Sequence, residues 1–346
     1  MKIHFVTQFT PNFNTAFSRQ SEYIIQYIRK MGLDFKVYTW ERQYHSPFNR
    51  GTLTIFPWYS IFLETIDPSD ILLFNGEYWA FPSELRKISC PIIWYTPLDT
   101  PVLPSGYDEV ASYADLIVPT TEWGKEIYEK YNYKNLFDPI PNTVAIADTI
   151  ERFDKEEDTI YIGTVIRPQK RKNIAAILKC LSMIEDKYKL LIVSEDELGE
   201  ICLSDMFRQF NIPHTLYEQI DVFTLRKIYN TIDLYMNLSM AEGFDLPLCE
   251  AIASGNCVLV TGFDEHKEIV TEERNLVDIK GKVRTPNGSE WYLVDENDFI
   301  KKFNSLRGAG FPHTKSDIIS KTNFDSVFPL WENLLLNLEK YLSCLE

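Results

Sequence analysis

Short apolar runs alternate with helix-length segments along this chain, and the alternation starts twice. The first series of apolar runs covers residues 2–9, 35–40, 70–74, 91–95 and 115–119. The second series covers residues 160–165, 189–194, 233–238 and 257–260. Strands that alternate with helices form mostly parallel sheets that are covered on both faces. The sequence therefore predicts an α/β protein with two doubly wound units, and 346 residues is about twice the length of a usual domain.

The amino-acid composition changes between the two series of apolar runs. Residues 139–158 contain two prolines followed by a charged stretch, which is typical of a linker. We predict an N-terminal Rossmann-like domain at 1–145, a linker at 146–158, a C-terminal Rossmann-like domain at 159–320 and a helical segment at 321–346. The leucine-rich and aromatic stretch 317–345 predicts one or two helices, which can pack back toward the N-terminal domain. Local signals also predict a first helix that is capped by Ser18 and ends at Gly32.

Composition excludes some classes of function. A formal charge of −15 argues against a nucleic-acid binder, which needs clustered Lys and Arg. Residues 1–50 are mildly basic, which indicates either a solvated helix face or contact with an anionic surface such as a membrane. No apolar run is long enough to span a membrane and no signal peptide is evident, so we expect a cytoplasmic protein. The six cysteines and five histidines are scattered, which predicts buried free thiols and no metal site.

One segment, residues 237–255, runs from a strand end through a loop into a helix. Pro247 suits the first position of this helix, and Gly255 suits the position just past its end. The backbone amides of residues 243–246 therefore lie at a helix start, which favours an anion. Glu242 and Glu250 flank this start, and carboxylates are good partners for sugar and ribose hydroxyl groups. Taken alone, the pattern fits an amphipathic helix with a charged edge equally well.

The amino-acid sequence of this segment, AEGFDLPLCEAIASGNCVLV, resembles the donor-binding signature of the family 4 glycosyltransferases. The resemblance implies a GT-B fold, with two Rossmann-like domains facing across a cleft. It also implies that Glu250 holds the ribose hydroxyls and that Glu242 contacts the transferred sugar. The donor phosphate or sugar would face the backbone around Gly243, Phe244, Asp245 and Leu246. Asp245 stands where the family usually has glycine, and this change adds negative charge near the sugar.

A second segment, residues 163–174, also follows a strand and opens a helix. Its Arg167 and Lys172 are five positions apart and resemble the basic pair with which the family clamps a diphosphate. Such a pair can neutralise the charge on a departing nucleotide diphosphate. Lys170 and Arg171 compete for these roles, and a solvated basic turn is the alternative.

The N-terminal half resembles the family only diffusely. Asp99 follows a strand in a proline-stiffened loop, where open sheets place ligands, so it is a candidate catalytic residue. An Asp that only fixes a turn is equally consistent with this loop. Residues 8–18 contain no glycine, unlike the family's first loop, although Asn12, Asn14 and Thr15 can line the cleft. The family's acceptor-loop histidine is not evident.

Together, these features predict a glycosyltransferase that needs no metal and no cofactor beyond its co-substrate, and the resemblance implies that it retains the configuration of the transferred sugar. The donor would be a UDP- or GDP-sugar. The acceptor hydroxyl would belong to a glycan, a lipid-linked intermediate, a protein or a small molecule. The alternatives are a sugar-nucleotide-binding scaffold without activity and a GT-B epimerase. An oxidoreductase is disfavoured because no GxGxxG follows the first strand.

Overall fold

A computed structural model describes residues 1–10, 15–144, 151–198 and 201–344 of the chain. The chain divides into two compact units. Unit 1 comprises Met1–Thr143 together with Phe324–Glu346, and unit 2 comprises Val144–Asn323. Residues 146–150 of the predicted linker lie outside the described residues, as do Asn12 and Asn14 of the first loop. Residues 151–156 of the predicted linker have no regular secondary structure.

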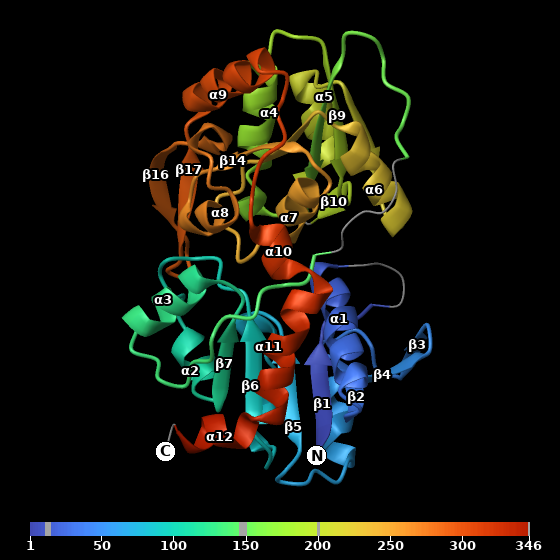
Figure 1. The fold of residues 1–346 in the computed structure, drawn as a ribbon, viewed down its shortest axis with the longest axis vertical. Coiled ribbons are helices and arrows are strands. Elements are labelled where there is room, and N and C mark those ends of the chain that lie inside the picture. The colour runs from blue at the N-terminus through green and yellow to red at the C-terminus, as the bar shows by residue number, and fades with distance from the viewer. Residues whose placement is uncertain (11–14, 145–150, 199–200, 345–346) are drawn as a thin grey trace. The chain divides into compact units, whose positions relative to one another are not determined.

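The described strands of unit 1 form one seven-stranded sheet, in the order β3-β4-β2-β1-β5-β6-β7 (Figure 1). The strands are β1 (Lys2–Thr7), β2 (Asp34–Thr39), β3 (Phe48–Arg50), β4 (Leu53–Pro57), β5 (Ile71–Asn75), β6 (Ile92–Thr96) and β7 (Leu116–Pro119). All neighbours pair in parallel except β3, which runs antiparallel to β4. Parallel pairing and full burial of the central strands agree with the predicted doubly wound sheet.

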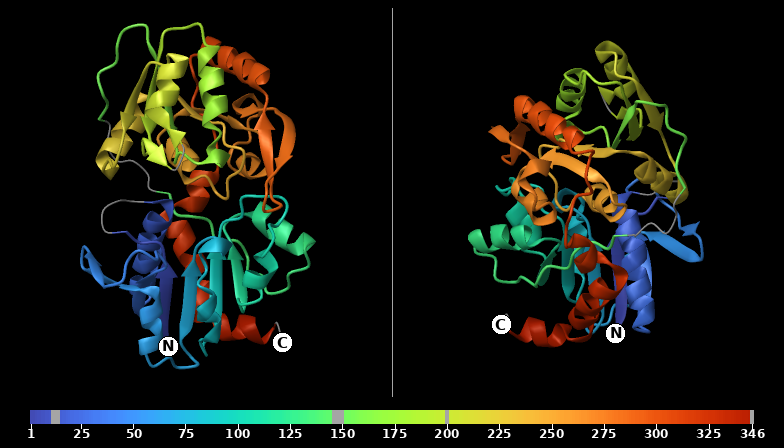
Figure 2. Two further views of the ribbon diagram at one scale, coloured as in Figure 1. Left: turned by 180° about the vertical axis from the view of Figure 1, so that it is seen from behind. Right: turned by 45° about the horizontal axis from the view of Figure 1, so that its top comes forward.

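Helices cover both faces of the unit 1 sheet. Its α-helices are α1 (Ala16–Lys30), α2 (Tyr107–Ala111), α3 (Glu122–Lys130), α11 (Phe324–Leu336) and α12 (Leu338–Ser343). Three short 3₁₀ helices, η1 (Trp58–Leu63), η2 (Tyr78–Ala80) and η3 (Ser83–Lys87), join the strands. One core lies between the sheet and α1, α11 and α12, and the other between the sheet and α2, α3 and the 3₁₀ turns. The end of the chain thus returns to the unit that holds its beginning, as Figure 2 also shows.

The described strands of unit 2 form a six-stranded parallel sheet, in the order β12-β9-β8-β13-β14-β15. The strands are β8 (Ile160–Val165), β9 (Tyr188–Val193), β12 (His214–Tyr217), β13 (Leu234–Asn237), β14 (Cys257–Thr261) and β15 (Leu276–Val277). Two antiparallel pairs stand outside this sheet: β10 (Glu197–Leu198) with β11 (Ile201–Cys202), and β16 (Ile279–Arg284) with β17 (Glu290–Val294). Neither pair was predicted from the sequence.

Unit 2 also has a helical layer on each face of its sheet. Its α-helices are α4 (Ile174–Ser182), α5 (Leu203–Phe210), α6 (Val222–Thr231), α7 (Leu246–Ala253), α8 (Asp264–Ile269), α9 (Glu296–Gly308) and α10 (Ile318–Thr322). The 3₁₀ helices are η4 (Lys170–Lys172) and η5 (Glu273–Asn275). Residues of α4, α5 and α9 share one core with the sheet, and residues of α6, α7, α8 and α10 share the other.

Two local predictions were wrong. The first helix is capped by Thr15 rather than Ser18: Thr15 Oγ1 accepts the Ser18 amide at 3.0 Å, and the helix begins at Ala16. The Ser18 hydroxyl instead donates to the Gln8 carbonyl at 3.2 Å, a contact that depends on the preceding loop. The C-terminal stretch forms three helices rather than one or two, and the first of them, α10, belongs to unit 2.

Other end signals were predicted correctly. Gly32 and Gly255 follow the caps of α1 and α7 with φ values of +69° and +81°, a left-handed backbone that glycine adopts without strain. Pro247 lies in the first turn of α7, where a missing amide hydrogen costs no helical hydrogen bond.

Candidate functional site

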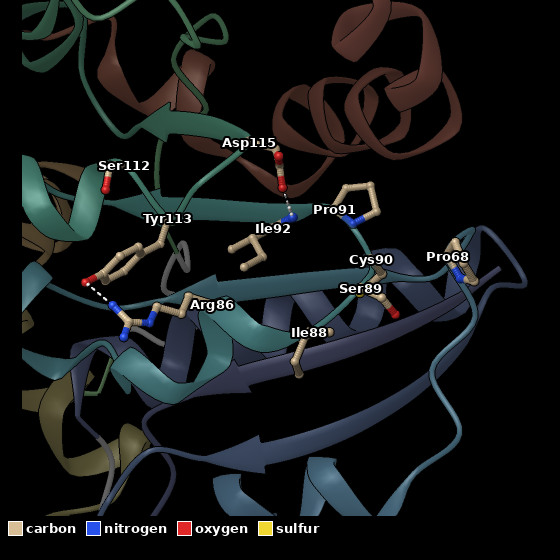
Figure 3. A pocket seen from close by; sticks show the side chains of 10 residues that line it. All are labelled: Pro68, Arg86, Ile88, Ser89, Cys90, Pro91, Ile92, Ser112, Tyr113 and Asp115. Carbon is tan, nitrogen blue, oxygen red and sulfur yellow. Dashed lines mark hydrogen bonds between the residues drawn. The ribbon is translucent and has the colours of Figure 1, made fainter.

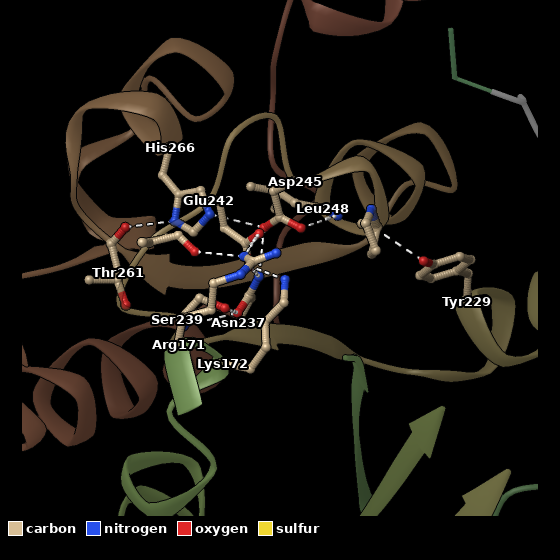
Figure 4. A network of polar contacts seen from close by, with 12 residues as sticks. Arg171, Lys172, Tyr229, Asn237, Ser239, Glu242, Asp245, Leu248, Thr261 and His266 are labelled. Atoms are coloured by element: carbon tan, nitrogen blue, oxygen red, sulfur yellow. Dashed lines mark hydrogen bonds and ion pairs between the residues drawn. The ribbon is translucent and has the colours of Figure 1, made fainter. Parts of the chain in front are cut away.

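The loop after β13 is organised around the side-chain amide of Asn237. The amide oxygen accepts the Ser239 backbone N–H at 3.0 Å and the Ser239 hydroxyl at 2.6 Å. These two contacts fix the orientation of the amide, so its Nδ2 is the donor toward two carboxylates. Nδ2 lies 2.7 Å from Asp245 Oδ2 and 3.3 Å from Glu242 Oε1. The fully buried Asn237 therefore holds together the two acids of this loop (Figure 4).

Glu242 is buried between two cations. Its Oε2 accepts a hydrogen bond from Arg171 Nη1 at 2.9 Å, and its Oε1 accepts one from Lys172 Nζ. Only 5% of the Glu242 side chain is exposed, and 11% of that of Lys172. Burial alone would raise the pKa of the Glu242 carboxyl. The charges of Lys172 and Arg171 outweigh burial and hold this pKa far below its ordinary value.

The loop that carries these cations is tied to the Glu242 loop through its backbone. Arg171 Nη1 also donates to the Ala241 carbonyl at 3.0 Å, and the Arg171 carbonyl accepts the Met240 amide at 2.7 Å. Asn173, in the left-handed conformation with φ +53°, donates from Nδ2 to the Leu238 carbonyl at 3.1 Å. These contacts join the loop after β8 to the loop after β13. Their strands are neighbours in the sheet.

The structure changes the predicted basic pair. Lys172 lies at Glu242 as the predicted site requires, but the second cation there is Arg171. Arg167 lies instead with its Nε 3.3 Å from Glu195 Oε2, and 44% of its side chain is exposed. The chain turns between them through the 3₁₀ segment η4, in which the Lys172 amide bonds to the Gln169 carbonyl at 2.9 Å. The sequence alone offered Arg171 only as a competing candidate.

The start of α7 is formed by residues that the sequence predicted as donor-binding. Gly243, Phe244, Asp245 and Leu246 are all buried, and the side chains of Phe244 and Leu246 belong to the core beneath the loop. Asp245 is the cap of α7, and its Oδ1 accepts the Leu248 amide at 3.3 Å. The side chain of Asp245 is turned into the protein and is 1% exposed. The backbone of this segment forms the start of α7, the end of a helix that carries a partial positive charge.

Glu250 lies in α7, on the side of α6. Its Oε2 accepts the hydroxyl of Tyr229 at 3.0 Å, so it contacts a different element from Glu242. Both carboxylates nevertheless act on one buried hydroxyl group. Burial raises the pKa of the Tyr235 hydroxyl well above its ordinary value, and the charges of Asp245, Glu242 and Glu250 raise it further. These three carboxylates belong to the loop and helix that follow β13.

Two residues of this network were not singled out from the sequence. His266 of α8 lies 2.9 Å from Asp245 through its Nε2, and Tyr229 of α6 reaches Glu250. Both contacts join residues 21 positions apart. Helical spacing explains Tyr229 as a core residue, and an isolated histidine carries no ligand signal, so no local pattern identified either.

Asp99 belongs to unit 1, in the loop after β6. It is partly buried, and its charge adds to the burial that raises the pKa of Tyr128 in α3. The neighbouring Thr100 folds this loop, because its Oγ1 donates to the Val102 carbonyl at 2.9 Å. Asp99 therefore lies at the carboxyl edge of the unit 1 sheet, where the sequence predicted it.

A hollow of about 600 Å³ lies at the opposite edge of the unit 1 sheet (Figure 3). It is lined by residues that precede β5, β6 and β7: Pro68, Arg86, Ile88, Ser89, Cys90, Pro91, Ile92, Ser112, Tyr113 and Asp115. Arg86 donates to the Tyr113 hydroxyl at 3.1 Å, and the Asp115 carboxylate accepts the Ile92 amide at 2.7 Å. These polar groups hold loops together at the amino ends of the strands, away from the edge where such sheets bind ligands.

The described residues show neither a candidate metal cluster nor a helix suited to crossing a membrane. Those residues contain no group of three or more His, Cys, Asp or Glu side chains placed to hold a metal ion. Among the helices described, none combines the length and the apolar character that crossing a bilayer requires.

Part of this chain is similar in sequence to known proteins. Residues 146–286 match the family described as glycosyl transferases group 1. Over 134 residues the chain is 26% identical to the O-antigen chain mannosyltransferase RfbU of Salmonella typhimurium strain LT2. That stretch is 38% of this chain and 37% of the relative, so the chain matches little more than a third of the relative's length.

Solved structures match over nearly the whole chain. The apo form of the lipopolysaccharide outer core galactosyltransferase WaaB matches with a TM-score of 0.65 at 14% identity, over 98% of this chain and 100% of that one. Sucrose-phosphate synthase from Thermosynechococcus elongatus matches with a TM-score of 0.71 at 13% identity, over 99% and 98%. At these identities the likeness concerns the fold. The chain therefore has the GT-B fold, and its residues 146–286 resemble the group 1 glycosyl transferases.

Proposed function

We propose that this protein transfers a sugar from a nucleotide-diphosphate sugar to a hydroxyl group of an acceptor. The buried cluster in unit 2 carries the proposal, because it places a carboxylate, two cations and a helix start together at the carboxyl edge of a parallel sheet. Open α/β sheets bind their ligands at this edge. The match of residues 146–286 to the group 1 glycosyl transferases supports the same assignment.

Each part of the cluster suits one part of such a donor. Amides at the start of α7 suit the diphosphate, because a helix N-terminus carries a partial positive charge. Glu250, in the same helix, suits the ribose hydroxyls, and Glu242 suits a hydroxyl of the transferred sugar. Glu242 is ionised with its two cations in place, so it accepts hydrogen bonds from hydroxyl groups without a change of protonation.

The chemistry that follows is a transfer with retention of configuration and without a metal ion. The bond between the anomeric carbon and the diphosphate oxygen breaks, and a bond to the acceptor oxygen forms on the same face. The acceptor proton passes to a phosphate oxygen of the departing nucleotide. Lys172 and Arg171 stabilise the negative charge that develops on the diphosphate, and Arg167 adds a half-exposed cation on the same loop.

The proposed donor is a UDP- or GDP-sugar. Structural neighbours support the UDP class: TarM was solved with UDP and α-GlcNAc-glycerol, and the pneumococcal O-GlcNAc transferase GtfA with UDP and GlcNAc. The matched relative RfbU is a mannosyltransferase, which keeps a GDP-sugar open. We propose an acceptor that binds near Asp99 of unit 1 and place the reaction in the cytoplasm. A glycan, a lipid-linked intermediate, a protein or a small molecule would supply the hydroxyl group.

A panel of UDP- and GDP-sugars tests this function directly. The protein is incubated with each donor, and release of free UDP or GDP by slow hydrolysis is measured, with and without added glycan acceptors. We expect release from at least one donor and its loss in Glu242→Ala. Glu185→Gln is the matched control, because Glu185 is an exposed acid of the same unit.

Two outcomes would contradict the transferase. Tight binding of a donor without release would indicate a sugar-nucleotide-binding protein. Conversion of the donor into its epimer would indicate an epimerase. If no sugar nucleotide bound or shifted the melting temperature, the donor site itself would be ruled out.

A further inference from the structure

Asp245 occupies a position that is unusual for an aspartate in two respects. Its backbone is left-handed, with φ +50°, a conformation in which Asn and Asp are tolerated but glycine is favoured. Its carboxylate lies at the start of α7, where a free negative charge would oppose a donor diphosphate. The side chain is nevertheless buried, with 1% exposed. A buried carboxylate requires a compensating charge.

The hydrogen bonds of His266 show where that charge comes from. His266 Nδ1 lies 2.7 Å from the carbonyl oxygen of Thr261, which can only accept, so Nδ1 carries a hydrogen. The other nitrogen, Nε2, lies 2.9 Å from Asp245 Oδ2. A neutral imidazole with its hydrogen on Nδ1 has only a lone pair on Nε2. One further proton must therefore lie between Nε2 and Asp245.

The partners of Asp245 assign that proton to the histidine. Asp245 Oδ2 accepts from Asn237 Nδ2 at 2.7 Å, and Oδ1 accepts the Leu248 amide at 3.3 Å. The Asn237 amide cannot turn around, because Ser239 donates to its oxygen twice. Hydrogen bonds that are donated to a carboxylate favour its ionised form. This geometry favours a positively charged ring on His266 beside a carboxylate on Asp245, a pair whose charges cancel.

Packing holds the imidazolium in place. The ring of Phe263 stacks on His266 with centroids 4.1 Å apart and an interplanar angle of 22°. Tyr292, from the β16–β17 pair, stacks on Phe263 at 5.5 Å and 14°. The Tyr292 amide also bonds to the Met240 carbonyl at 2.8 Å, in the loop that carries Glu242. The histidine has no exposed surface, so it has little freedom to leave Asp245.

We propose that Asp245 and His266 act as one electrically neutral positioning unit for the sugar-nucleotide donor. The pair fixes Asn237, and through Asn237 it holds the loop of Glu242. The proton of His266 cancels the charge of Asp245, so no net negative charge lies at the start of α7 to repel a diphosphate. His266 is a positioning residue in this account, because it acts through Asp245. The inference rests on the proposed donor site.

A double-mutant cycle at His266 and Asp245 separates the effect of their charges on nucleotide binding from the effect of their contact. His266→Gln keeps a side-chain amide near Nε2 but removes the positive charge, whereas Asp245→Asn removes the negative charge. UDP and GDP serve as probes, and affinity is measured by calorimetry at pH 7.5. We expect His266→Gln to weaken binding of the nucleotide at least tenfold. Adding Asp245→Asn to that variant should restore affinity to within about threefold of the unchanged protein.

The cycle overturns the proposal in either of two ways. One is a His266→Gln variant that binds within threefold of the unchanged protein. The other is a double variant no better than His266→Gln, which is what a purely structural role predicts. Melting temperatures of all variants check that each is folded, and a double variant that is folded but not restored counts against the proposal.

Nitrogen NMR of the histidine ring tests the proton without any ligand. We expect both ring nitrogens of His266 to be protonated at pH 7.5, with the signal assigned by its absence in His266→Gln. A neutral ring would refute the pair as described. If UDP, GDP and their sugars fail to bind the unchanged protein, the donor site fails, while this spectrum still decides the state of His266.

Discussion

The two units place an asparagine at corresponding points of sheets whose parallel strands follow the same order, but the two asparagines have different partners. Asn75 ends β5, the neighbour of β1 in unit 1, and Asn237 ends β13, the neighbour of β8 in unit 2. Asn75 Nδ2 lies 3.2 Å from the hydroxyl of Thr7 and 3.1 Å from that of Ser21. Asn237 Nδ2 instead bonds to two carboxylates.

The difference shows that one sheet topology can carry different side chains at the carboxyl ends of its strands. In both sheets the strand order reverses beside the first strand, so the loops there diverge and leave room for polar groups. The residues that meet at that point then decide the chemistry. In unit 1 the side chain of Asn75 contacts hydroxyl groups. In unit 2 the side chain of Asn237 contacts carboxylates, and one of these carboxylates binds two cations. This contrast favours unit 2 as the site of the proposed anionic donor.

Replacement of Glu242, the acid between the two cations, should cause the largest loss of stability. Glu242→Gln leaves the buried Lys172 and the partly buried Arg171 without their anion. Breaking a buried ion pair from one side costs roughly 3–5 kcal/mol of unfolding free energy. Chemical denaturation monitored by circular dichroism measures this loss. A loss below about 1 kcal/mol, similar to that of the exposed control Glu185→Gln, would show that the cluster is not held by its charges.

The stabilisation that Glu242 provides should depend on pH. The folded-state pKa of Glu242 lies below its ordinary value of 4.5, so its contribution to stability is fully present above that pH and is lost as the pH falls below it. The difference in unfolding free energy between the unchanged protein and Glu242→Gln should stay constant from pH 6 to pH 8. Below pH 4.5 it should shrink by up to about 1.4 kcal/mol per pH unit. A difference that grows on acidification would contradict the sign of this coupling.

Lys172→Met tests the cation that is buried with Glu242. If Lys172 stabilises the departing diphosphate, its loss should lower the rate of sugar transfer or donor hydrolysis by about 10² to 10³-fold. The matched control is Lys187→Met, because Lys187 is a largely exposed lysine of the same unit. Arg167→Met should have a smaller effect than Lys172→Met, since Arg167 is half exposed and paired with Glu195. The reverse order would restore Arg167 to the principal role that the sequence predicted.

Asn75→Ala should have the smallest effect and sharpens the contrast between the edges. The Thr7 and Ser21 hydroxyls lose a shared donor, which costs about 1–2 kcal/mol of unfolding free energy. Binding of UDP or GDP should stay within about threefold of the unchanged protein. A large loss of nucleotide affinity would show that unit 1 also holds the donor.

Much of the fold could be predicted because strands and helices have local periodicities. The run predicted at 70–74 is observed as Ile71–Asn75, and that at 189–194 as Tyr188–Val193. The β10–β11 pair was not predicted because each strand has only two residues, and β16 was not predicted because three of its six residues are Lys or Arg. The cap of α1 was misplaced since Thr15 and Ser18 are both good caps, and only the contact of Ser18 with Gln8 distinguishes them.

By itself, the sequence determined the two sheets, the loop and helix that carry Glu242 and Glu250, and Lys172 as a basic partner. These depend on neighbours along the chain, through periodicity, capping and a resemblance in one segment. The tertiary structure alone decided that Arg171 rather than Arg167 meets Glu242, that His266 meets Asp245, and that α11 packs in unit 1. The first two contacts join residues 71 and 21 positions apart, and α11 packs against residues from the other end of the chain. No local pattern encodes partners so distant along the chain.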